Sequence, residues 1–438
     1  MKVYFDTLGC PKNFNDTQCA EGILEKGGYT IVQSPEDADY IIVNTCGFIN
    51  DAKKESIEHI FDMLQYQENG AKVIVSGCLS QRYVDDLLEE MPEVDGFLGV
   101  NDYEGICQFL EYLDKEKALV NPCEQKVLET LPRKYDENPY TATIKIAEGC
   151  NNHCAYCIIP SIRGHFRSKK EEDIFSEAKV LAEKGCKELI LIAQDVTQYG
   201  VDLYHEFRLP KLLKKLCKIE GIQWIRLMYC YEDRITDELI EVMQSEDKIC
   251  KYIDIPIQHC SDNVLKAMNR RSTSQSINST ISKLKAAIPD IHIRTTLIVG
   301  FPGETEDDFD ELIDFVESTK FARLGVFAYS QEENTVAGEM ECQIDDDIKE
   351  ARVDAIMRRQ LDISYNLNQE KIGKTLKVLV ESVDDESDHS YIGRTEFDAP
   401  EIDNSVIFTS LKALSPGDLV DVLIEDAYDY DLVGKEVD

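Results

Sequence analysis

One short run constrains this chain more than any other part of its sequence: Gly149-Cys150-Asn151-Asn152-His153-Cys154-Ala155-Tyr156-Cys157. Its three cysteines follow a C-x-x-x-C-x-x-C spacing. Because iron–sulfur clusters are held by cysteine thiolates, such a loop can bind three irons of a four-iron cluster. The next cysteine, Cys186, lies beyond local reach. The fourth iron is therefore left open, and a small molecule can chelate it.

The same spacing leaves a second interpretation open. In a zinc knuckle, the three cysteines would share one ion with His153 or His165 as the fourth ligand. Such a site is closed and structural, whereas an iron with an open position is a place for chemistry. The spacing favours the cluster and keeps zinc as the alternative.

Composition limits the compartment and the partners. The chain has 438 residues and 15 cysteines, an odd number. With no secretory leader at the N-terminus, this count argues against a disulfide framework and predicts a cytoplasmic protein with thiolate ligands. No apolar stretch approaches the roughly 20 residues of a membrane span. The net charge of −37 repels phosphate backbones. It favours a basic protein partner, or it reflects a solubility or salt adaptation of the host.

Residues 1–120 alternate strand-like runs with amphipathic stretches, which predicts an open parallel α/β domain. The runs are 2–5, 40–44, 72–76 and 96–100. Cys10, Cys46 and Cys78 follow the first three runs, each beside a glycine. Since the carboxyl ends of parallel strands meet at one edge of a sheet, we expect these thiols to converge there. They predict a second cluster site with an open iron, and the alternative is three unrelated cysteines at strand ends.

Residues 121–139 are a predicted linker, and residues 140–365 hold six more strand-like runs with helical patterns between them. The runs are 143–147, 188–193, 224–230, 252–257, 292–299 and 324–329. Six βα units are too few for a closed eight-fold barrel. We therefore predict an open six-stranded (β/α) barrel, with the cysteine loop directly after its first strand.

Residues 367–438 change to short strand-like runs, at 375–381, 391–395 and 418–425, broken by Asp, Ser, Pro and Gly. This pattern predicts a small antiparallel β-barrel. From Lys371 onward there are six basic and 17 acidic residues, a net charge of −11. A nucleic-acid-binding barrel should be basic, so we expect no direct binding of tRNA.

Two three-cysteine groups in this order, followed by a small barrel, resemble the methylthiotransferase family of radical S-adenosylmethionine (SAM) enzymes over nearly the whole chain. The resemblance implies a methylthiotransferase N-terminal domain, a radical SAM core and an OB-like TRAM domain. Four motifs are similar to the RimO-type branch, which acts on an aspartyl residue of small-subunit ribosomal protein S-twelve. They are Leu8-Gly9-Cys10-Pro11-Lys12-Asn13 and residues 158–164, 252–259 and 298–305. The chain departs from the branch pattern at Lys169, Cys260 and Asn334.

The resemblance also implies the chemistry. Cys150, Cys154 and Cys157 would hold the [4Fe-4S] cluster that reduces SAM to a 5′-deoxyadenosyl radical. Cys10, Cys46 and Cys78 would hold a second, auxiliary [4Fe-4S] cluster that presents the sulfur. One SAM would donate the methyl group and another the radical, and the methylthio group would be inserted at the β-carbon of the aspartyl residue. An electron donor protein and a sulfide donor are the further expected partners.

Contacts to SAM are expected in the cysteine loop and at strand ends, where each residue has packing or capping as its alternative role. The expected contacts are Tyr156, Gln194, Asp195, Gln258, Arg294 and Gly300. Lys12 and Arg163 are candidates to pair with the target aspartate. Two other functions stay open. One is a tRNA adenosine methylthiotransferase (MiaB type), against which the acidic third segment stands, and the other is a non-catalytic zinc-binding protein.

Overall fold

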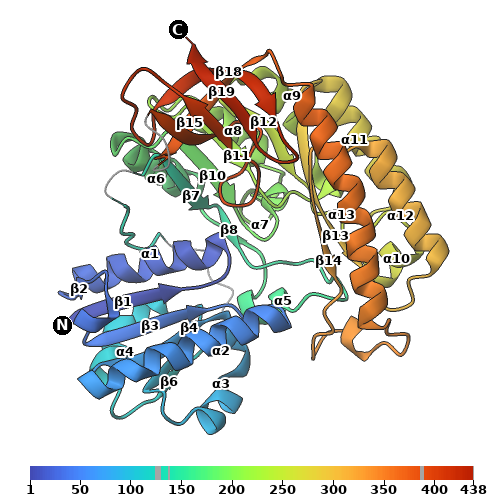
Figure 1. Cartoon of the computed structure of the whole chain (residues 1–438). Helices are drawn as coiled ribbons and strands as arrows, with labels where there is room; N and C mark the ends of the chain where they lie inside the picture. Colours follow the sequence, from blue (N-terminus) through green and yellow to red (C-terminus); the bar gives the residue numbers. More distant parts are fainter. Residues whose placement is uncertain (124–129, 137–138, 385–388, 438) are drawn as a thin grey trace.

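The computed structural model describes residues 1–123, 130–136, 139–384 and 389–437. Two six-stranded parallel sheets are followed by a closed five-stranded barrel (Figure 1). The predicted α/β fold class is confirmed. Residues 124–129 and 137–138 of the predicted linker lie outside the described residues. In the described ranges, no helix combines the length and apolar character that crossing a membrane requires.

The first sheet is parallel throughout and has the order β2-β1-β3-β4-β5-β6. Its strands are β1 (Lys2–Thr7), β2 (Thr30–Ile31), β3 (Tyr40–Thr45), β4 (Lys72–Gly77), β5 (Gly96–Leu98) and β6 (Ala118–Leu119), and its helices are α1 (Pro11–Lys26), α2 (Asn50–Leu64), α3 (Cys78–Glu90) and α4 (Ile106–Tyr112). Helices α1 and α4 bury one face of the sheet, and α2 and α3 bury the other. Burial on both faces explains why β3 is apolar over most of its length.

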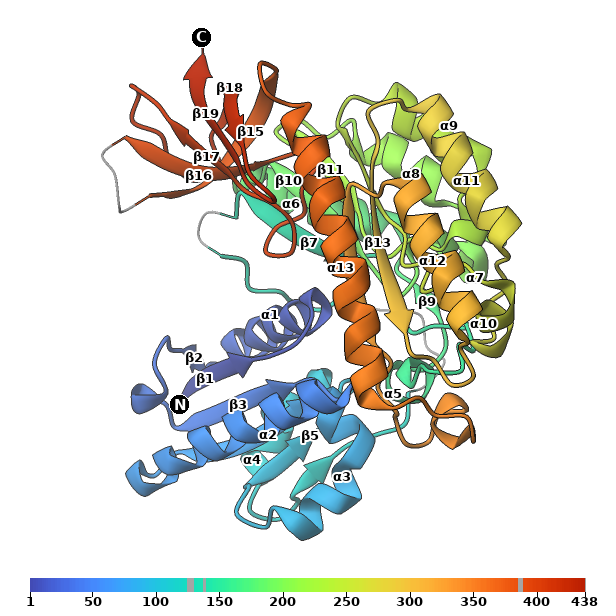
Figure 2. The ribbon, with the colours of Figure 1, turned by 45° about the vertical axis from the view of Figure 1, so that its right-hand side comes forward.

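The second sheet is also parallel, and it stays open with the order β14-β13-β12-β11-β10-β7. The strands are β7 (Thr141–Lys145), β10 (Glu188–Ile192), β11 (Trp224–Leu227), β12 (Ile249–Asp254), β13 (His292–Val299) and β14 (Arg323–Ala328), with a small ladder of β8 (Ala147–Glu148) and β9 (Arg167–Ser168). The helices are α5 (Ile159–Arg163), α6 (Glu171–Glu183), α7 (Val201–Tyr204), α8 (Leu209–Leu216), α9 (Asp237–Ser245), α10 (Asp262–Ala267), α11 (Ser274–Ala287), α12 (Glu306–Thr319) and α13 (Asp346–Gln369). The larger helices cover the outer face of the sheet (Figure 2).

The largest differences between predicted and observed strands of this sheet are at two runs. The run predicted at 224–230 ends at Leu227, because Tyr229 adopts a left-handed φ of 62° that interrupts the extended backbone. The run predicted at 252–257 spans Ile249–Asp254, since Pro256 has no amide to donate to a ladder. The apolar residues that misled the prediction are still buried, but outside the ladder.

The C-terminal barrel closes in the order β15-β16-β17-β19-β18. Its strands are β15 (Thr375–Val383), β16 (Ser390–Thr395), β17 (Val406–Thr409), β18 (Leu419–Ala427) and β19 (Leu432–Val437). The prediction missed β17 and β19. These two strands pair in parallel, whereas the other four pairings are antiparallel as predicted. Helix α13 runs across the boundary predicted at residues 365–367.

The barrel packs against the inner face of the second sheet through an apolar cluster that contains Trp224, Leu379 and Leu419. Beside this cluster, Glu188 is fully buried between two arginines. Arg226 comes from the second sheet and lies 2.8 Å from Glu188, and Arg394 comes from the barrel. The contact therefore buries a triad of one carboxylate and two guanidinium groups, in which Glu188 pairs with both arginines.

We expect Glu188→Ala to lower the free energy of unfolding by about 3–5 kcal/mol, because it leaves two buried guanidinium groups without their carboxylate. Trp224 is the only tryptophan of the chain, so its fluorescence during urea denaturation reports this interface. The matched control is Asp354→Ala, which breaks an exposed pair with Arg358. This control should change the free energy of unfolding by no more than ~0.5 kcal/mol. Equal losses in the two variants would contradict the role of the triad.

The same triad predicts an acid-sensitive contribution. Burial raises the pKa of Glu188, but Arg394 and Arg226 outweigh burial and lower it from 4.5 to about 2. A folded-state pKa below the unfolded one means that the stabilisation is present above about pH 4.5 and is lost as the pH falls towards about 2. Over that window, the wild type should lose more stability than Glu188→Ala.

Candidate active site

Cys10, Cys46 and Cys78 follow β1, β3 and β4, which are neighbours in the first sheet. Cys10 caps the start of α1, Cys46 comes directly after its strand, and Cys78 is the first residue of α3. Cys46 interacts electrostatically with both other thiols. The topology thus brings three thiols, far apart in the chain, to one edge of the sheet.

Glycines allow the loops that carry these thiols to approach each other. Gly9 has a φ of 90°, and a Cβ there would lie 2.9 Å from the Cβ of Cys46. A Cβ at Gly47 would lie 2.8 Å from the backbone nitrogen of Leu79, at the start of α3. Any larger residue at either position would push the loops apart.

The second group lies on a loop that the β8–β9 ladder closes at its base. Three other segments hold this loop through its backbone. The amide of Cys150 donates to the carbonyl of Gly164 (3.0 Å), the amide of Ala155 donates to that of Met268 (2.8 Å), and the amide of Ala337 donates to the carbonyl of Ala155 (2.8 Å). The loop therefore presents Cys150, Cys154 and Cys157 from a fixed backbone.

The surroundings of the thiols suit iron-bound thiolates. All six cysteines are free of disulfides. The amide of Asn152 donates to Sγ of Cys150 at 3.4 Å, and Nη2 of Arg163 donates to Sγ of Cys78 at 3.4 Å. Donors to sulfur stabilise a thiolate and tune a cluster. Burial raises the pKa of the Cys46 and Cys150 thiols to about 11, so these cysteines release protons when they bind iron.

The zinc alternative is not supported by the placement of its ligands. Within the ranges that the structure describes, no three His, Cys, Asp or Glu side chains are arranged around a single ion. His153 and His165 are exposed, and the ring of His165 contacts Asn151 at 3.3 Å. A four-iron cluster spreads its thiolates over separate irons, so it needs no such tight group.

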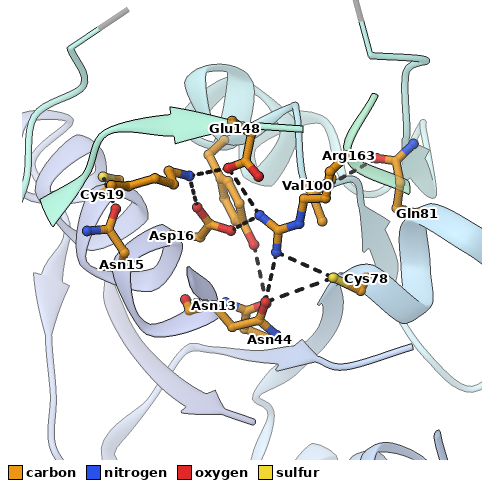
Figure 3. A network of polar contacts seen from close by, with 12 residues as sticks. Asn13, Asn15, Asp16, Cys19, Asn44, Cys78, Gln81, Val100, Glu148 and Arg163 are labelled. Atoms are coloured by element: carbon orange, nitrogen blue, oxygen red, sulfur yellow. Dashed lines mark hydrogen bonds and ion pairs between the residues drawn. The ribbon is translucent and has the colours of Figure 1, made fainter. Parts of the chain in front are cut away.

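A buried polar network lies between the first and second sheets and includes Cys78 of the N-terminal cysteine group (Figure 3). At its centre is Arg163, 2% exposed, at the end of the short helix α5 that follows Cys157. Besides Cys78, its guanidinium contacts Asn13 (2.8 Å), Asp16 (2.6 Å) and Glu148 (3.4 Å). Arg163 is thus already paired. Of the two candidates to pair with the target aspartate, Arg163 is therefore the less favoured, because two carboxylates of the chain already neutralise it.

Lys145 completes this network. Its ammonium lies 2.5 Å from Asp16 and 2.6 Å from Glu148, so it bridges the first sheet's helix α1 and the second sheet. Burial alone would raise the pKa of Glu148, but the charges of Lys145 and Arg163 hold it well below its usual range. Glu148 therefore remains ionised, and the ion pairs of Lys145 and Arg163 with Asp16 and Glu148 keep the two sheets together on the β7 side.

A second clamp closes the β14 side. Glu332, 2% exposed, follows β14 and accepts from Lys53 of α2 (2.9 Å) and Arg82 of α3 (3.1 Å). Arg82 also donates to the carbonyl of Gly47 at 2.9 Å, beside Cys46. The following turn has Asn334 at a φ of 60°, a conformation that asparagine tolerates, which explains why it can replace glycine there. Clamps at both edge strands thus enclose the two cysteine groups at one interface.

The expected SAM contacts fall into two sets. Asp195 is fully buried, pairs with Arg234 and accepts from the side chain of Asn152 (3.3 Å), so it supports the cysteine loop. Gln194 donates to Glu148 (2.7 Å), and its buried Oε1 has no partner among the described residues.

The other expected contacts lie further round the second sheet. Gln258 has a φ of 72° and bridges to Leu297, and Gly300 has a φ of 71° after β13. Tyr156 packs in the apolar cluster with Phe301. Arg294 lies in the first half of β13 and is engaged by Asp254 (3.1 Å) and by Asp403 of the barrel (3.5 Å). The structure therefore leaves Arg294 paired, away from the strand ends.

The prediction missed a polar group next to the cysteine loop. Tyr231 Oη lies 3.8 Å from Sγ of Cys154, and the guanidinium of Arg270 lies 4.6 Å above the Tyr231 ring. Arg270 also pairs with Glu232 at 3.0 Å. Nη1 of Arg270 and Oε1 of Glu232 are buried and without a partner in the described part of the chain. A signal existed, since Tyr231 and Glu232 follow the third strand of the sheet, at its carboxyl end.

Comparisons with known proteins agree with this geometry. Family models match in three consecutive parts: "Uncharacterized protein family UPF0004" at residues 2–99, "Radical SAM superfamily" at 144–316 and "TRAM domain" at 372–437. The chain is 50% identical to the ribosomal protein uS12 methylthiotransferase RimO of Desulforamulus reducens over 434 residues, 98% of each chain. It is 49% identical to that of Clostridioides difficile, over 99% of this chain and 98% of the relative.

Solved structures support the fold. The radical SAM methyltransferase TsrM of Kitasatospora setae, with cobalamin and a [4Fe-4S] cluster bound, matches with a TM-score of 0.57 and 13% identity, over 77% of both chains. The cobalamin-dependent radical SAM enzyme OxsB matches with a TM-score of 0.54 and 14% identity, over 82% of this chain and 56% of that one. At such identities, the likeness concerns the fold alone.

Proposed function

The chain belongs to the RimO family of ribosomal protein uS12 methylthiotransferases, which are radical SAM enzymes, and we propose that it inserts a methylthio group at the β-carbon of an aspartyl residue of uS12. The observation that carries this proposal is the enclosure of two three-cysteine groups at one interface. We propose two [4Fe-4S] clusters, one on Cys150, Cys154 and Cys157 and one on Cys10, Cys46 and Cys78. One reactant can meet both groups only if they share a cavity.

When bound, the clusters and SAM supply the carbon radical and the sulfur that inserting a thiomethyl group into an unactivated C–H bond requires. The chain's own residues hold the two cysteine groups in place. Asp195 and Arg234 fix the cysteine loop through Asn152, and Arg163 donates to Cys78. The clamps at the two edge strands hold the domain that carries Cys10, Cys46 and Cys78 against the domain that carries the cysteine loop.

SAM carries an amino group and a carboxylate, and the chain offers groups for both. Glu232 and Arg270 each present one buried polar atom without a partner among the described residues, beside Cys154. We propose that they bind SAM together with Gln194 and the backbone around Tyr156. Asp195, Gln258 and Gly300 then shape the site, whereas Arg294 is engaged by Asp254 and Asp403 and lies outside it.

The family membership also bears on the partners. Relatives that modify uS12 and an acidic barrel both argue against the tRNA alternative. We propose an electron donor protein, a sulfide donor and the cytoplasm as the site of action, because ribosomal proteins are found there. We also propose three domains, 1–120, 140–365 and 367–438, joined at 121–139, with α13 crossing the last boundary.

Mass spectrometry of uS12 tests the function. Protein reconstituted with iron and sulfide under anaerobic conditions should contain about eight irons per chain. With SAM and a reductant, it should add one methylthio group to a single aspartyl residue of uS12. Modification of tRNA with unmodified uS12 would favour the alternative, and zinc with no brown colour would end the enzyme proposal.

A further inference from the structure

Lys12 differs from the other cations at the interface between the two sheets. Lys53, Lys145 and Arg163 each pair with a carboxylate. Lys12 is only 8% exposed, yet the described residues provide no carboxylate partner for its ammonium. An ammonium that no carboxylate among the described residues engages keeps its N–H donors open to an anionic partner.

The position of Lys12 points to the reaction site. It is the second residue of α1, immediately after the strand end that carries Cys10. Its ammonium lies 3.6 Å from the centroid of the Tyr229 ring, beyond the end of β11 in the second sheet. Lys12 therefore crosses the interface that the two cysteine groups share.

The surroundings of Tyr229 are already neutralised. Its backbone amide donates to the carboxylate of Asp254 at 3.0 Å, and Asp254 also pairs with Arg294. The charge of Lys12 lowers the pKa of the Tyr229 phenol, but burial, Cys10 and Asp254 outweigh it and the pKa is raised above its usual value. The face of the Tyr229 ring gives Lys12 a cation–π contact but accepts no conventional hydrogen bond. The three N–H donors of Lys12 are therefore open to an anion.

We propose that Lys12 binds the side-chain carboxylate of the target aspartate, an inference that rests on the proposed function. The β-carbon of aspartate is bonded directly to that carboxylate. A carboxylate held by Lys12 therefore sets the β-carbon at the interface of the two cysteine groups, in the fixed orientation that a radical reaction needs. Lys12 is thereby a substrate-binding residue that selects aspartate over neutral side chains.

The test compares affinities for uS12 with its natural target aspartate and for uS12 with asparagine there. Calorimetry on the reconstituted full chain gives both dissociation constants. The wild type should prefer the aspartate form by about 10- to 100-fold, the range expected for a hydrogen bond to a charged group. Lys12→Met keeps the side-chain length and the contact with the ring but removes the charge, so the preference should fall to about onefold. Lys12→Arg should restore part of it.

Lys26→Met is the matched control, because Lys26 is an exposed lysine in the last turn of the same helix. It should keep the full preference, and iron content should be the same in all variants. If the Lys12→Met protein prefers the aspartate form as strongly as the wild type does, the role given to Lys12 is wrong, while the proposed function stands. A wild type that neither binds nor modifies uS12 would overturn the proposed function, and this inference with it.

Discussion

Replacing Cys154 with alanine is expected to abolish the formation of 5′-deoxyadenosine from SAM. The cysteine loop should keep its shape, because Met268 and Ala337 hold it through the backbone of Ala155. The variant therefore removes one thiolate ligand without unfolding the site. Iron should fall from about eight to about four per chain, since the second cysteine group is unaffected.

Chromatographic detection of 5′-deoxyadenosine after anaerobic reconstitution measures this effect. Cys342→Ala is the control, because Cys342 is exposed, lies between β14 and α13, and belongs to neither cysteine group. It should give as much product as the wild type. If Cys154→Ala still cleaved SAM reductively, the assignment of the central cysteine group would be wrong.

Cys78→Ala should separate the two halves of the reaction. We expect it to retain 5′-deoxyadenosine formation and to lose methylthiolated uS12 down to background. Alanine is well tolerated at the first position of α3, so the fold should survive. The donor of Arg163 loses its sulfur acceptor but keeps Asp16, Glu148 and Asn13. Arg163 should therefore continue to join the two sheets.

The readout is mass spectrometry of uS12 alongside the 5′-deoxyadenosine assay on the same sample. Cys107→Ala is the matched control. Cys107 is half-buried in α4, a helix that packs on the same sheet, and it belongs to neither cysteine group. It should keep both activities. Methylthiolated uS12 from Cys78→Ala would refute the role given to the N-terminal thiols, even if the central group behaves as expected.

Local pattern was sufficient for most of the two parallel sheets. The run 292–299 matches β13 in full, and the run 188–193 matches β10 to within one residue. Strand β10 is buried on both faces and apolar over most of its length, whereas β13 alternates buried and half-buried residues, and both lie between helical patterns. The errors fall where backbone geometry overrides apolar character, as at Tyr229 and Pro256. The barrel strands β17 and β19 were missed because short, half-exposed strands carry little periodic signal.

The spacing of Cys150, Cys154 and Cys157, and the place of Cys10, Cys46 and Cys78 after strands, were determined by the sequence alone. Ligand spacing on one loop is local, and the meeting of parallel strand ends follows from sheet topology. Which cation is paired could be decided only by the tertiary structure. Arg163 and Lys12 are alike as residues in a sequence, but folding places Arg163 among Asp16 and Glu148 and leaves Lys12 over a neutral ring. The pairing of Arg163 with Asp16 joins segments 147 residues apart, and no local pattern encodes such a contact.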